Sequence, residues 1–433
     1  MRPSIRGSSA GQLVASIRGQ IDAGALLPGE VLPSIRSLAA DLGVNRNTVA
    51  AAYAQLAAAG VVETRRRGGT VVLGVPAVEG EGFASAPELV NLASGNPDAA
   101  LLPRITGDIV DRFQLPLYGA AAILPELHDW ADRHLVPEVE GPHRLVLTHG
   151  SVDAVERLLS AHLTRGDAVA MEDPCFLSSL GILRLGGYQL APVPMDHEGM
   201  TVDGLTAALA AGARAVVCTP RAHNPTGTSL TADRATALRA VLAQHPGVLV
   251  IEDDHFSMVS SQPYLRITPP DASRWALVRS VSKFLGPDLR VAFVLTDSDT
   301  GDRLGSRLSS ATTWVSHLLQ HIVEHLLRDP ATVSLLASAR RTYVDRSGQL
   351  ISALAEHDIT VHPRVDGLNV WIPLAAGTTA VVDELARAGW AVRRGSSFSS
   401  AAQPTPAIRV TTATLTADQA SRFAADLAPI LHR

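Results

Sequence analysis

The chain has 433 residues, 46% of them hydrophobic, and a formal net charge of −5 from 37 Lys+Arg and 42 Asp+Glu. This length and apolar content predict two or three domains with buried cores and exclude an intrinsically disordered protein. The sequence contains no apolar run of the roughly 18 residues that a membrane span needs, and no secretory signal. We therefore expect a cytoplasmic protein without a membrane partner. Two cysteines and fifteen scattered histidines show no spacing typical of a metal site.

The charge is unevenly distributed along the chain. Residues 1–75 carry eight arginines and four acidic residues, a net charge of +4, whereas the remainder carries 29 basic and 38 acidic residues, a net charge of −9. Among all basic residues only Lys283 is a lysine, and the other 36 are arginines. A basic N-terminal module is compatible with a nucleic-acid partner, but a small positive charge is also common in ordinary domains. The local pattern has to decide between the two.

The first 75 residues predict a winged helix-turn-helix domain. Leu13, Ile17 and Ile21 recur every four residues in a helix over 12–23. A second helix is expected over 34–42, with Ser34 as N-cap and Gly43 as its end, and a third over 47–59. Two β-like runs, 61–63 and 71–73, follow and are joined by a turn over 64–69. Helix, helix, tight turn, helix and hairpin is the order of a winged helix-turn-helix.

Residues 27–72, from Leu-Pro-Gly-Glu-Val-Leu to Gly-Gly-Thr-Val-Val, resemble the GntR-type DNA-binding domain. The resemblance implies that double-stranded DNA contacts two sets of residues, one at the recognition helix and one in the wing: Arg36, Asn45, Arg46, Asn47 and Thr48, and Arg65, Arg66 and Arg67. Short polar residues at the start of such a helix can enter a major groove about 12 Å wide, and arginines can pair with phosphates or guanine edges. The alternative is that the arginine triplet is only a solvated hairpin tip.

Residues 76–89 are rich in Gly, Pro, Ala and Glu without a period and are predicted to be a linker. After them, apolar runs over 168–171, 215–218, 248–251, 276–278 and 291–295 alternate with helical stretches. This pattern predicts an α/β domain over 90–433 with a mostly parallel sheet. Ligands of such sheets bind at the carboxyl ends of the strands. Polar clusters directly follow three of these runs, at 219–227, 252–255 and 280–283.

Lys283 is the residue that indicates the chemistry of this domain. In a chain that uses arginine for almost every positive charge, the one lysine stands where an amine is needed, because a guanidinium cannot form a Schiff base. Ser280, Ser282 and Arg290 nearby are residue types that hold a phosphate. An amine that bonds an aldehyde carbon beside a phosphate site is the requirement of pyridoxal 5'-phosphate (PLP).

Two further residues at strand ends fit the same cofactor. Asp253 could pair with a protonated pyridine nitrogen, and Asn224 could donate to the ring phenolate oxygen. The competing interpretation makes 223–227 a turn, Asp253 an exposed strand end and Lys283 a surface charge. The occurrence of all three at strand ends, in order along the chain, favours the cofactor.

Residues 91–433, which open with Asn-Leu-Ala-Ser-Gly-Asn-Pro-Asp, resemble the fold type I PLP-dependent aminotransferases, whose large sheet is followed by a smaller C-terminal α+β subdomain. By this resemblance Tyr118 reaches the phosphate in the partner subunit, and Phe176 stacks on the pyridine ring. Gly150, Ser151 and Val152 form the phosphate turn at a helix N-terminus. Arg409 is implied to clamp a substrate carboxylate.

The sequence departs from the aminotransferase pattern at a few positions. His255 and Phe256 stand where family members often carry a tyrosine, so His255 either contacts the cofactor or packs as a core residue. Val152 replaces a common glutamine, and Arg394 replaces a common proline.

A GntR-type head joined to an aminotransferase-like domain is the combination found in the MocR subfamily of bacterial regulators, and the runs EDDHFS and SVSKFLGPDLRVAFV are similar to those of its PtsJ-type members, which are linked to vitamin B6 salvage. The resemblance implies a homodimeric transcriptional regulator that senses PLP through a Schiff base with Lys283, with an amine or amino acid as a possible co-effector. Two alternatives are a working aminotransferase with a fused DNA-binding domain and a DNA-binding protein whose large domain only dimerises.

Overall fold

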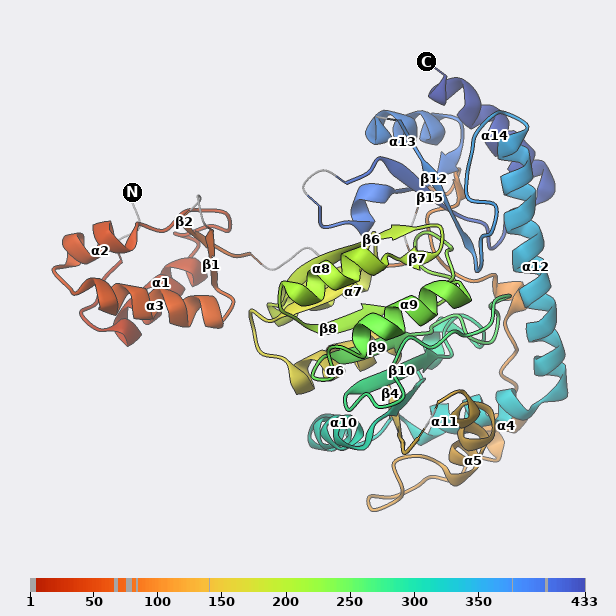
Figure 1. Ribbon diagram of the computed structural model, residues 1–433, viewed down its shortest axis with the longest axis horizontal. Coiled ribbons are helices and arrows are strands. Elements are labelled where there is room, and N and C mark those ends of the chain that lie inside the picture. Colours follow the sequence, from red (N-terminus) through yellow and green to blue (C-terminus); the bar gives the residue numbers. More distant parts are fainter. Residues whose placement is uncertain are drawn as a thin grey trace. The chain divides into compact units, whose positions relative to one another are not determined.

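The computed structural model describes residues 5–65, 69–74, 80–82, 85–139, 141–375, 377–401 and 404–432. The chain divides into two compact units, Met1–Ala77 and Val78–Arg433. Figure 1 draws the first unit in red and orange and the second from orange through green to blue. Each unit has its own hydrophobic core and is described by itself.

The N-terminal unit contains three helices and a two-stranded hairpin in the predicted order: α1 (Ala10–Asp22), α2 (Ile35–Leu42), α3 (Arg46–Ala58), β1 (Val62–Arg65) and β2 (Gly69–Val72). Leu13 and Ile17 of α1 are buried together with Val49 and Leu56 of α3. The helix-face spacing read from the sequence therefore marks the core side of α1. This arrangement confirms the winged helix-turn-helix.

Helix boundaries in this unit follow from local capping. The Ser34 side chain accepts a hydrogen bond from the backbone N–H of Ser37 (3.1 Å), and Gly43 ends α2 in the left-handed conformation (φ 66°). The hairpin differs from the expectation, because β1 continues through Thr64 and Arg65 into the segment predicted as turn. Thr64 pairs with Thr70, and their hydroxyls are 3.3 Å apart. The β-branched threonines favour extended backbone, which lengthens the hairpin.

The large unit is built around one mixed sheet with the strand order β4-β11-β10-β9-β8-β5-β6-β7. Its strands are β4 (Arg144–Thr148), β5 (Ala168–Asp173), β6 (Gln189–Asp196), β7 (Gly199–Met200), β8 (Ala213–Cys218), β9 (Leu249–Asp253), β10 (Trp275–Ser280) and β11 (Ala292–Thr296). The central pairs from β10 through β6 are parallel, whereas β11 runs antiparallel to both of its neighbours and β7 runs antiparallel to β6. The prediction of a mostly parallel sheet is confirmed.

Both faces of this sheet are covered by helices, as its continuously apolar strands require. Alternate strand residues pack to opposite sides, so that Val169 contacts the core around α6, whereas Ala170 belongs to the core on the other face. Figure 1 shows α8 and α9 in front of the sheet. The helices that cover the two faces of the sheet are α6 (Ser151–His162), α7 (Leu177–Gly186), α8 (Val202–Ala210), α9 (Ala232–Leu242) and α10 (Ser298–Ala311).

A smaller subdomain forms the C-terminal part of the large unit. It contains a three-stranded sheet of order β12-β15-β14, flanked by helices. Its elements are α12 (Pro330–Ala355), β12 (Asn369–Pro373), α13 (Thr378–Arg387), β13 (Trp390–Ala391), β14 (Arg393–Arg394), β15 (Ala407–Thr411) and α14 (Ala417–Leu431). The short strand β3 (Val90–Asn91) pairs in parallel with β13, which brings the beginning of the unit beside its end.

The remaining elements are short or peripheral. They are the helices α4 (Gly107–Asp111), α5 (Pro125–His134) and α11 (His317–Arg328), and the 3-10 turns η1 (Ala99–Leu101), η2 (Val136–Glu138), η3 (Pro287–Leu289) and η4 (Gly395–Phe398). Within the described ranges, no helix is both long enough and apolar enough to cross a membrane. Those ranges also contain no group of three or more His, Cys, Asp or Glu residues that could hold a metal ion.

Candidate functional site

The strand register brings the predicted polar clusters to one edge of the large sheet. Parallel strands β8, β9 and β10 all end at that edge, and Asp253, the last residue of β9, pairs with Val278 of β10. Asn224 and Lys283 follow β8 and β10, respectively, on the same side. The edge of the sheet therefore collects residues that are 59 positions apart in the chain, from 224 to 283.

Lys283 is held at this edge by the backbone of another segment. Its Nζ donates a hydrogen bond to the carbonyl oxygen of Gly95 at 2.8 Å. Burial lowers the pKa of Lys283, an effect that Arg409 reinforces and Glu81 opposes. A lowered pKa favours the neutral amine, which is the form that attacks a carbonyl carbon.

A carboxylate, an amide and a guanidinium meet beside Lys283. Arg409, on β15 of the small subdomain, is fully buried and donates to Oδ1 of Asn224 (3.0 Å) and to the carbonyl of Ala93 (2.7 Å). Its two terminal nitrogens also donate to the two carboxylate oxygens of Glu81, at 2.6 and 3.1 Å. The small subdomain thus contributes the guanidinium and the large sheet contributes the amine.

Asp253 carries a buried oxygen that lacks a partner. Among the described residues, nothing donates a hydrogen bond to Oδ1 of Asp253, although the side chain is almost fully buried. Burial raises the pKa of Asp253 to about 7, and the neighbouring Asp254 adds to the effect. A buried carboxylate in this state is suited to a cationic or N–H partner from a ligand.

We expect Asp253→Asn to stabilise the protein without added ligand. The pKa of Asp253 is raised to about 7 in the folded chain, whereas in the unfolded chain it is near 4. Between about pH 4 and pH 7 the folded chain therefore binds a proton at Asp253 that the unfolded chain does not bind. This group's contribution to stability is therefore greatest below about pH 4 and is lost as the pH rises to about 7. Denaturant unfolding should show the variant more stable at pH 8 by on the order of a few kcal/mol, with the difference shrinking towards pH 4. A gain that is equal at both pH values would contradict this origin.

The opposite end of the site has the features of an anion cradle. The register between β11 and β4 pairs Ala292 with Thr148, which places Arg290 opposite Gly150. The Arg290 guanidinium donates to the carbonyl of His149 at 2.8 Å, and a Cβ at Gly150 would lie 2.5 Å from one of its nitrogens. A larger residue would push the flexible Arg290 guanidinium away, and the φ of 92° at Gly150 is a conformation that favours glycine.

The donors around this cradle come from a helix end and from hydroxyls. α6 begins at Ser151, with Val152 in its first turn, so its first backbone N–H groups are available to an anion. The Ser280 and Ser282 hydroxyls lie 3.0 Å apart at the end of β10.

The structure brings some of the remaining predicted residues to the site and not others. His255 lies close enough to Lys283 for that charge to lower its pKa, which burial reduces to about 4, so the ring is neutral at pH 7. Phe176 is partly buried between the end of β5 and α7. Tyr118 is 91% exposed, and its ring lies 5.6 Å from that of Trp314.

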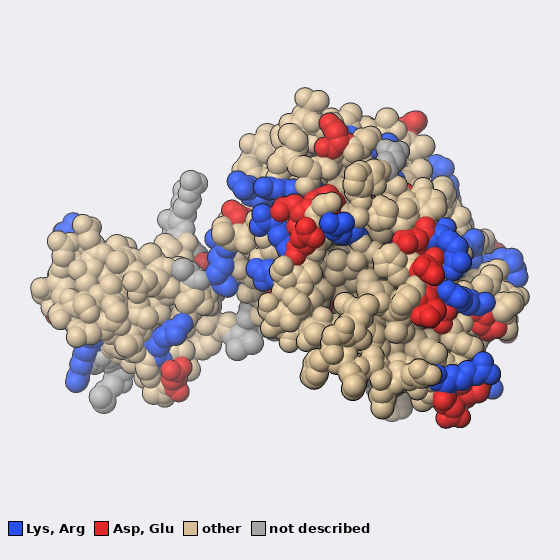
Figure 2. All heavy atoms as spheres, turned by 90° about the horizontal axis from the view of Figure 1, so that it is seen from below, with Lys and Arg blue, Asp and Glu red and all other residues tan. Residues whose placement is uncertain are grey.

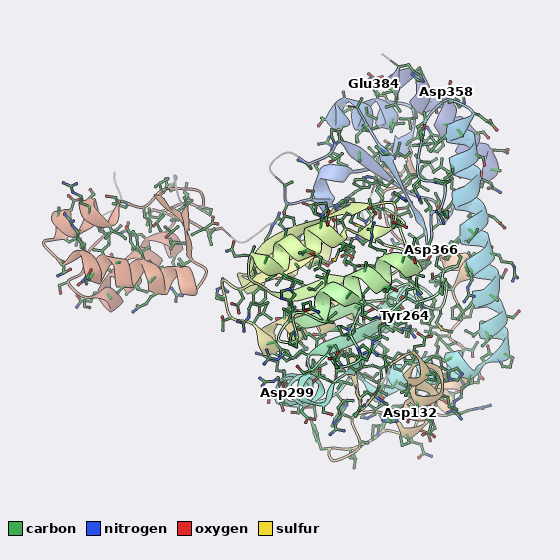
Figure 3. All side chains as sticks on the ribbon, viewed as in Figure 1. Asp132, Tyr264, Asp299, Asp358, Asp366 and Glu384 are labelled. Carbon is green, nitrogen blue, oxygen red and sulfur yellow. The ribbon has the colours of Figure 1, made fainter. Side chains whose placement is uncertain are left out.

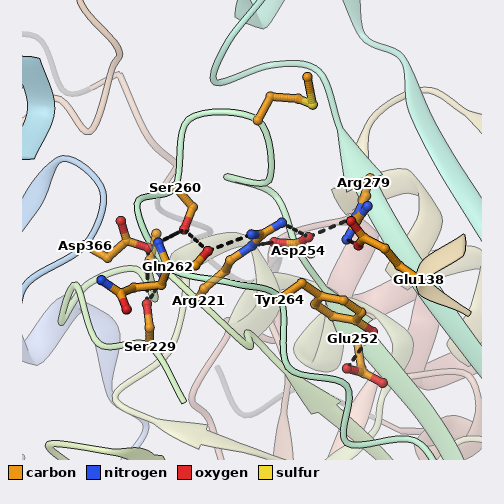
Figure 4. A network of polar contacts seen from close by, with 12 residues as sticks. Glu138, Arg221, Ser229, Glu252, Asp254, Ser260, Gln262, Tyr264, Arg279 and Asp366 are labelled. Atoms are coloured by element: carbon orange, nitrogen blue, oxygen red, sulfur yellow. Dashed lines mark hydrogen bonds and ion pairs between the residues drawn. The ribbon is translucent and has the colours of Figure 1, made fainter. Parts of the chain in front are cut away.

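A buried ionic network supports the strand end that carries Asp253 (Figure 4). Asp254 is fully buried and accepts two hydrogen bonds from Arg221, at 2.7 and 2.8 Å, and one from Arg279 at 2.9 Å. Arg279 also pairs with Glu138, and Arg221 donates to the carbonyl of Gln262. The alternative interpretation, in which Asp253 and Asp254 form an exposed strand end, is therefore wrong.

The same network reaches the small subdomain. Asp366 accepts hydrogen bonds from the hydroxyls of Ser229, Ser260 and Ser261, and its own backbone N–H donates to Gly227 (2.8 Å). Figure 3 labels Asp366 near the junction of the large sheet and the small subdomain. Asn224 lies three residues before Gly227, so this contact fixes the loop that presents it.

Sequence reasoning missed Glu81, Gly95 and Asp254. Glu81 belongs to a segment without periodicity, and nothing in its local sequence indicates a contact with Arg409, 328 positions away. Gly95 is part of the opening strand motif but was not singled out. Asp254 belongs to the predicted polar cluster 252–255, but nothing in the sequence indicates its contacts with Arg221 and Arg279.

The predicted DNA-contacting residues lie at the start of α3 and on α2. Asn45 caps α3 by accepting a hydrogen bond from the N–H of Asn47 at 2.8 Å. The exposed side chains are those of Arg36, Asn45, Arg46 and Asn47, and Thr48 is half-buried. Arg65 ends β1, and Arg66 and Arg67 lie outside the described residues. The face drawn in Figure 2 shows scattered basic side chains on the N-terminal unit, one of them beside an acidic side chain, and interleaved basic and acidic side chains on the large unit.

Fold and site together define a DNA-binding domain joined to an aminotransferase-like domain, and comparison with known proteins agrees. Residues 9–72 match the bacterial regulatory proteins of the gntR family, and residues 87–427 match aminotransferase class I and II. The chain belongs to the MocR type of transcriptional regulator, in which a gntR-family head precedes an aminotransferase class I and II domain.

Relatives of both kinds support this assignment. The chain is 45% identical over 431 residues to the vitamin B6 salvage pathway transcriptional repressor PtsJ of Salmonella typhimurium, covering 99% of this chain and 100% of that one. The probable rhizopine catabolism regulatory protein MocR of Rhizobium meliloti is 26% identical over 328 residues, 67% of this chain and 66% of that protein. A kynurenine aminotransferase of Pyrococcus horikoshii has a TM-score of 0.71 at 19% identity, over 80% of this chain and 91% of that one, which shows the fold alone.

Proposed function

We propose that this regulator senses PLP and alters its binding to double-stranded operator DNA in response. The observation that carries the proposal is the position of Lys283, the one lysine of the sequence, which lies partly buried with a lowered pKa at the edge of the sheet where Asp253 ends β9. The 45% identity to a vitamin B6 salvage repressor supports regulation of vitamin B6 genes, and a role on DNA would be compatible with a cytoplasmic protein.

The residues of the site fit PLP in charge and hydrogen bonding. Asp253, with its unpartnered oxygen, would face the ring nitrogen, and Asn224 would donate to the ring oxygen. Ser280, Ser282, Arg290 and the first N–H groups of α6 would hold the phosphate. Phe176 would stack on the ring, and His255, being neutral, would act as a hydrogen-bond donor. When bound, PLP supplies an aldehyde carbon and an electron-withdrawing ring.

Each protein group has a separate task in this arrangement. Lys283 would supply the amine that bonds the aldehyde carbon, and burial lowers its pKa, which favours the neutral form. Asp253, as a carboxylate, would accept a hydrogen bond from the protonated ring nitrogen, and the positive charge there would favour the ionised form of the buried carboxyl. Arg409 binds the carboxylate of an amino-acid co-effector, for which a planar bidentate donor is well suited.

A homodimer is the expected assembly. Leu115, Leu117 and Tyr118 are 85%, 81% and 91% exposed, which is unusual for large apolar side chains that lie together. A second chain covering this segment would bring Tyr118 towards the partner's phosphate site. A dimer would also carry two winged helices, which is how small DNA-binding domains read paired half-sites.

The decisive experiment is the visible absorption spectrum of the purified protein with PLP, before and after borohydride reduction. We expect a visible band that reduction abolishes, with the cofactor fixed to the peptide that contains Lys283. No visible band, or label elsewhere, would exclude the proposal and favour a large domain that only dimerises. Incubation with an amino acid tests the second candidate, a working aminotransferase, which the buried Arg409 favours. Bleaching of the band by the amino acid, and its return when a 2-oxo acid is added to take up the amino group, would establish turnover.

Arg46→Ala should weaken DNA binding without affecting the cofactor. Arg46 is exposed in the first turn of α3, so its removal deletes a phosphate or base contact. The expected loss is about 1–3 kcal/mol, measured by fluorescence anisotropy on DNA selected by the wild type from a random pool. Arg18→Ala, an exposed arginine on α1, removes the same charge from the same unit as a control. Equal losses for both variants would show that only overall charge matters.

A further inference from the structure

The guanidinium of Arg409, which would bind the carboxylate of a ligand, is already hydrogen-bonded to a carboxylate of the chain itself, that of Glu81. Both oxygens of Glu81 accept hydrogen bonds from Arg409, at 2.6 and 3.1 Å, which is the bidentate geometry of an arginine with a bound carboxylate. The first oxygen also accepts from Nδ2 of Asn224 at 2.6 Å. The Glu81 carboxylate is therefore bonded by the same two side chains that would bind an amino-acid ligand.

The carboxylate is buried deeply and fits closely. A Cβ at Gly95 would lie 2.0 Å from one oxygen of Glu81, so the carboxylate rests directly on the backbone of the residue whose carbonyl holds Lys283. Burial by itself raises the pKa of Glu81, but the charge and hydrogen bonds of Arg409 outweigh it, and the pKa lies below its ordinary value. Lys283 contributes in the same direction. Glu81 is thus an anion in the site at neutral pH.

Backbone contacts hold the segment that carries Glu81. The N–H of Gly82 donates to the carbonyl of Ser94 at 2.8 Å, and the Arg393 guanidinium donates to the carbonyl of Gly80 at 3.4 Å. Residues 80–82 come three positions after Ala77, where the N-terminal unit ends. Whatever moves Glu81 therefore acts on the segment that connects the sensor to the DNA-binding unit.

We propose that Glu81 is an intramolecular ligand that competes with the carboxylate of an effector for Arg409 and Asn224. An effector of the amino-acid class, with a carboxylate for Arg409 and an amine near Lys283, displaces Glu81 and releases residues 80–82 from the site. This inference rests on the proposed function, because it assigns the regulatory step to the same site. An effector and Glu81 then cannot bind Arg409 at the same time, so residues 80–82 are held at the site only when no effector is bound.

Competition of this kind has a measurable signature. When a site is accessible only for the fraction of time that its internal ligand is absent, the apparent affinity of an external ligand falls by that fraction. If Glu81 occupies Arg409 for 90–99% of the time, its removal tightens the binding of a simple carboxylate by roughly 10- to 100-fold.

Calorimetric titration with sodium propionate, at constant ionic strength, measures this change. The full-length protein with PLP is compared as wild type, Glu81→Gln and Glu88→Gln. Glu88 is exposed in the same stretch, so its substitution removes the same charge from outside the site. We expect at least tenfold tighter propionate binding for Glu81→Gln and less than a twofold change for Glu88→Gln. Equal affinity in all three proteins, or no binding in any of them, would overturn the inference.

Hydrogen exchange of the wild type provides a second readout that needs no variant. Saturating propionate should accelerate exchange of the Gly82 amide, because its bond to Ser94 breaks when the segment leaves. Unchanged exchange under saturation would contradict displacement. The visible spectrum of the same samples reports PLP binding separately, and the titration is repeated without PLP. A missing cofactor band with propionate competition intact would therefore refute the proposed function, and would leave only the competition of Glu81 for Arg409 and Asn224 established.

Discussion

Lys283→Ala and Lys283→Arg are both expected to abolish covalent retention of PLP. After borohydride reduction and denaturation, the wild type should carry about one PLP per chain, and neither variant should carry any. The physical reason is that only an amine can form the bond, and the sequence has no second lysine to replace Lys283. The arginine variant keeps the positive charge, so a loss there separates bond formation from electrostatic attraction. Mass spectrometry of the reduced protein measures the outcome.

A lysine placed elsewhere controls for non-specific labelling. Arg274 is half-buried and lies between β9 and β10, directly before β10 begins and therefore at the end of that strand opposite to Lys283. The double variant Lys283→Arg, Arg274→Lys restores one lysine to the chain but not to the site, and we expect it to remain unlabelled. Stoichiometric label on the new lysine would show that position does not determine attachment.

Asp254→Ala should cause the largest loss of stability of any single change near the site. Its carboxylate is fully buried and pairs with both Arg221 and Arg279, whose side chains are only 9% and 5% exposed. Removing it leaves two buried guanidinium groups without their shared partner, a change that typically costs about 3–5 kcal/mol. Denaturant unfolding of the variant and wild type, without cofactor, gives the difference directly.

Asp299→Ala is the matched control for this loss. Asp299 pairs with Arg303 at 2.8 Å, but both side chains are about half exposed, so solvent screens the pair. We expect no measurable change in its unfolding free energy. If Asp254→Ala and Asp299→Ala behave alike, the network of Figure 4 does not support the strand end that carries Asp253.

Local chemistry made much of the fold predictable. Ser34, Gly43 and the four-residue spacing of Leu13 and Ile17 define helix ends and faces through nearby atoms, and the structure reproduces them within a few residues. Strand order and the antiparallel course of β11 were not predicted, because hydrogen-bond partners in a sheet are set by packing between distant segments. The glycines that follow Thr64 and Arg65 predict a turn there. In the structure these two residues pair with Thr70 and Gly69 across the hairpin, and this pairing extends β1.

Some residues of the candidate site can likewise be predicted from the local sequence, and others cannot. Lys283, Asp253 and Asn224 were found because each follows a recognisable apolar strand, and the parallel register then brings them together. Glu81 could not be found, because its role depends on a contact with Arg409 that joins opposite ends of the large unit. Residue chemistry predicts Arg290 as a phosphate ligand, and the family resemblance implies the phosphate turn at Gly150, but the close approach of the two follows from the pairing of β4 with β11.

PLP is expected to act on DNA binding through Lys283, and a DNA titration with and without PLP measures this effect. DNA selected by the wild type is titrated with wild type and Lys283→Ala, each with and without PLP, and the dissociation constants are read from gel shifts at one salt concentration. A coupling of about 1–3 kcal/mol predicts a PLP-dependent change of roughly 5- to 150-fold for the wild type and none for the variant. Identical dissociation constants under all four conditions would contradict the account.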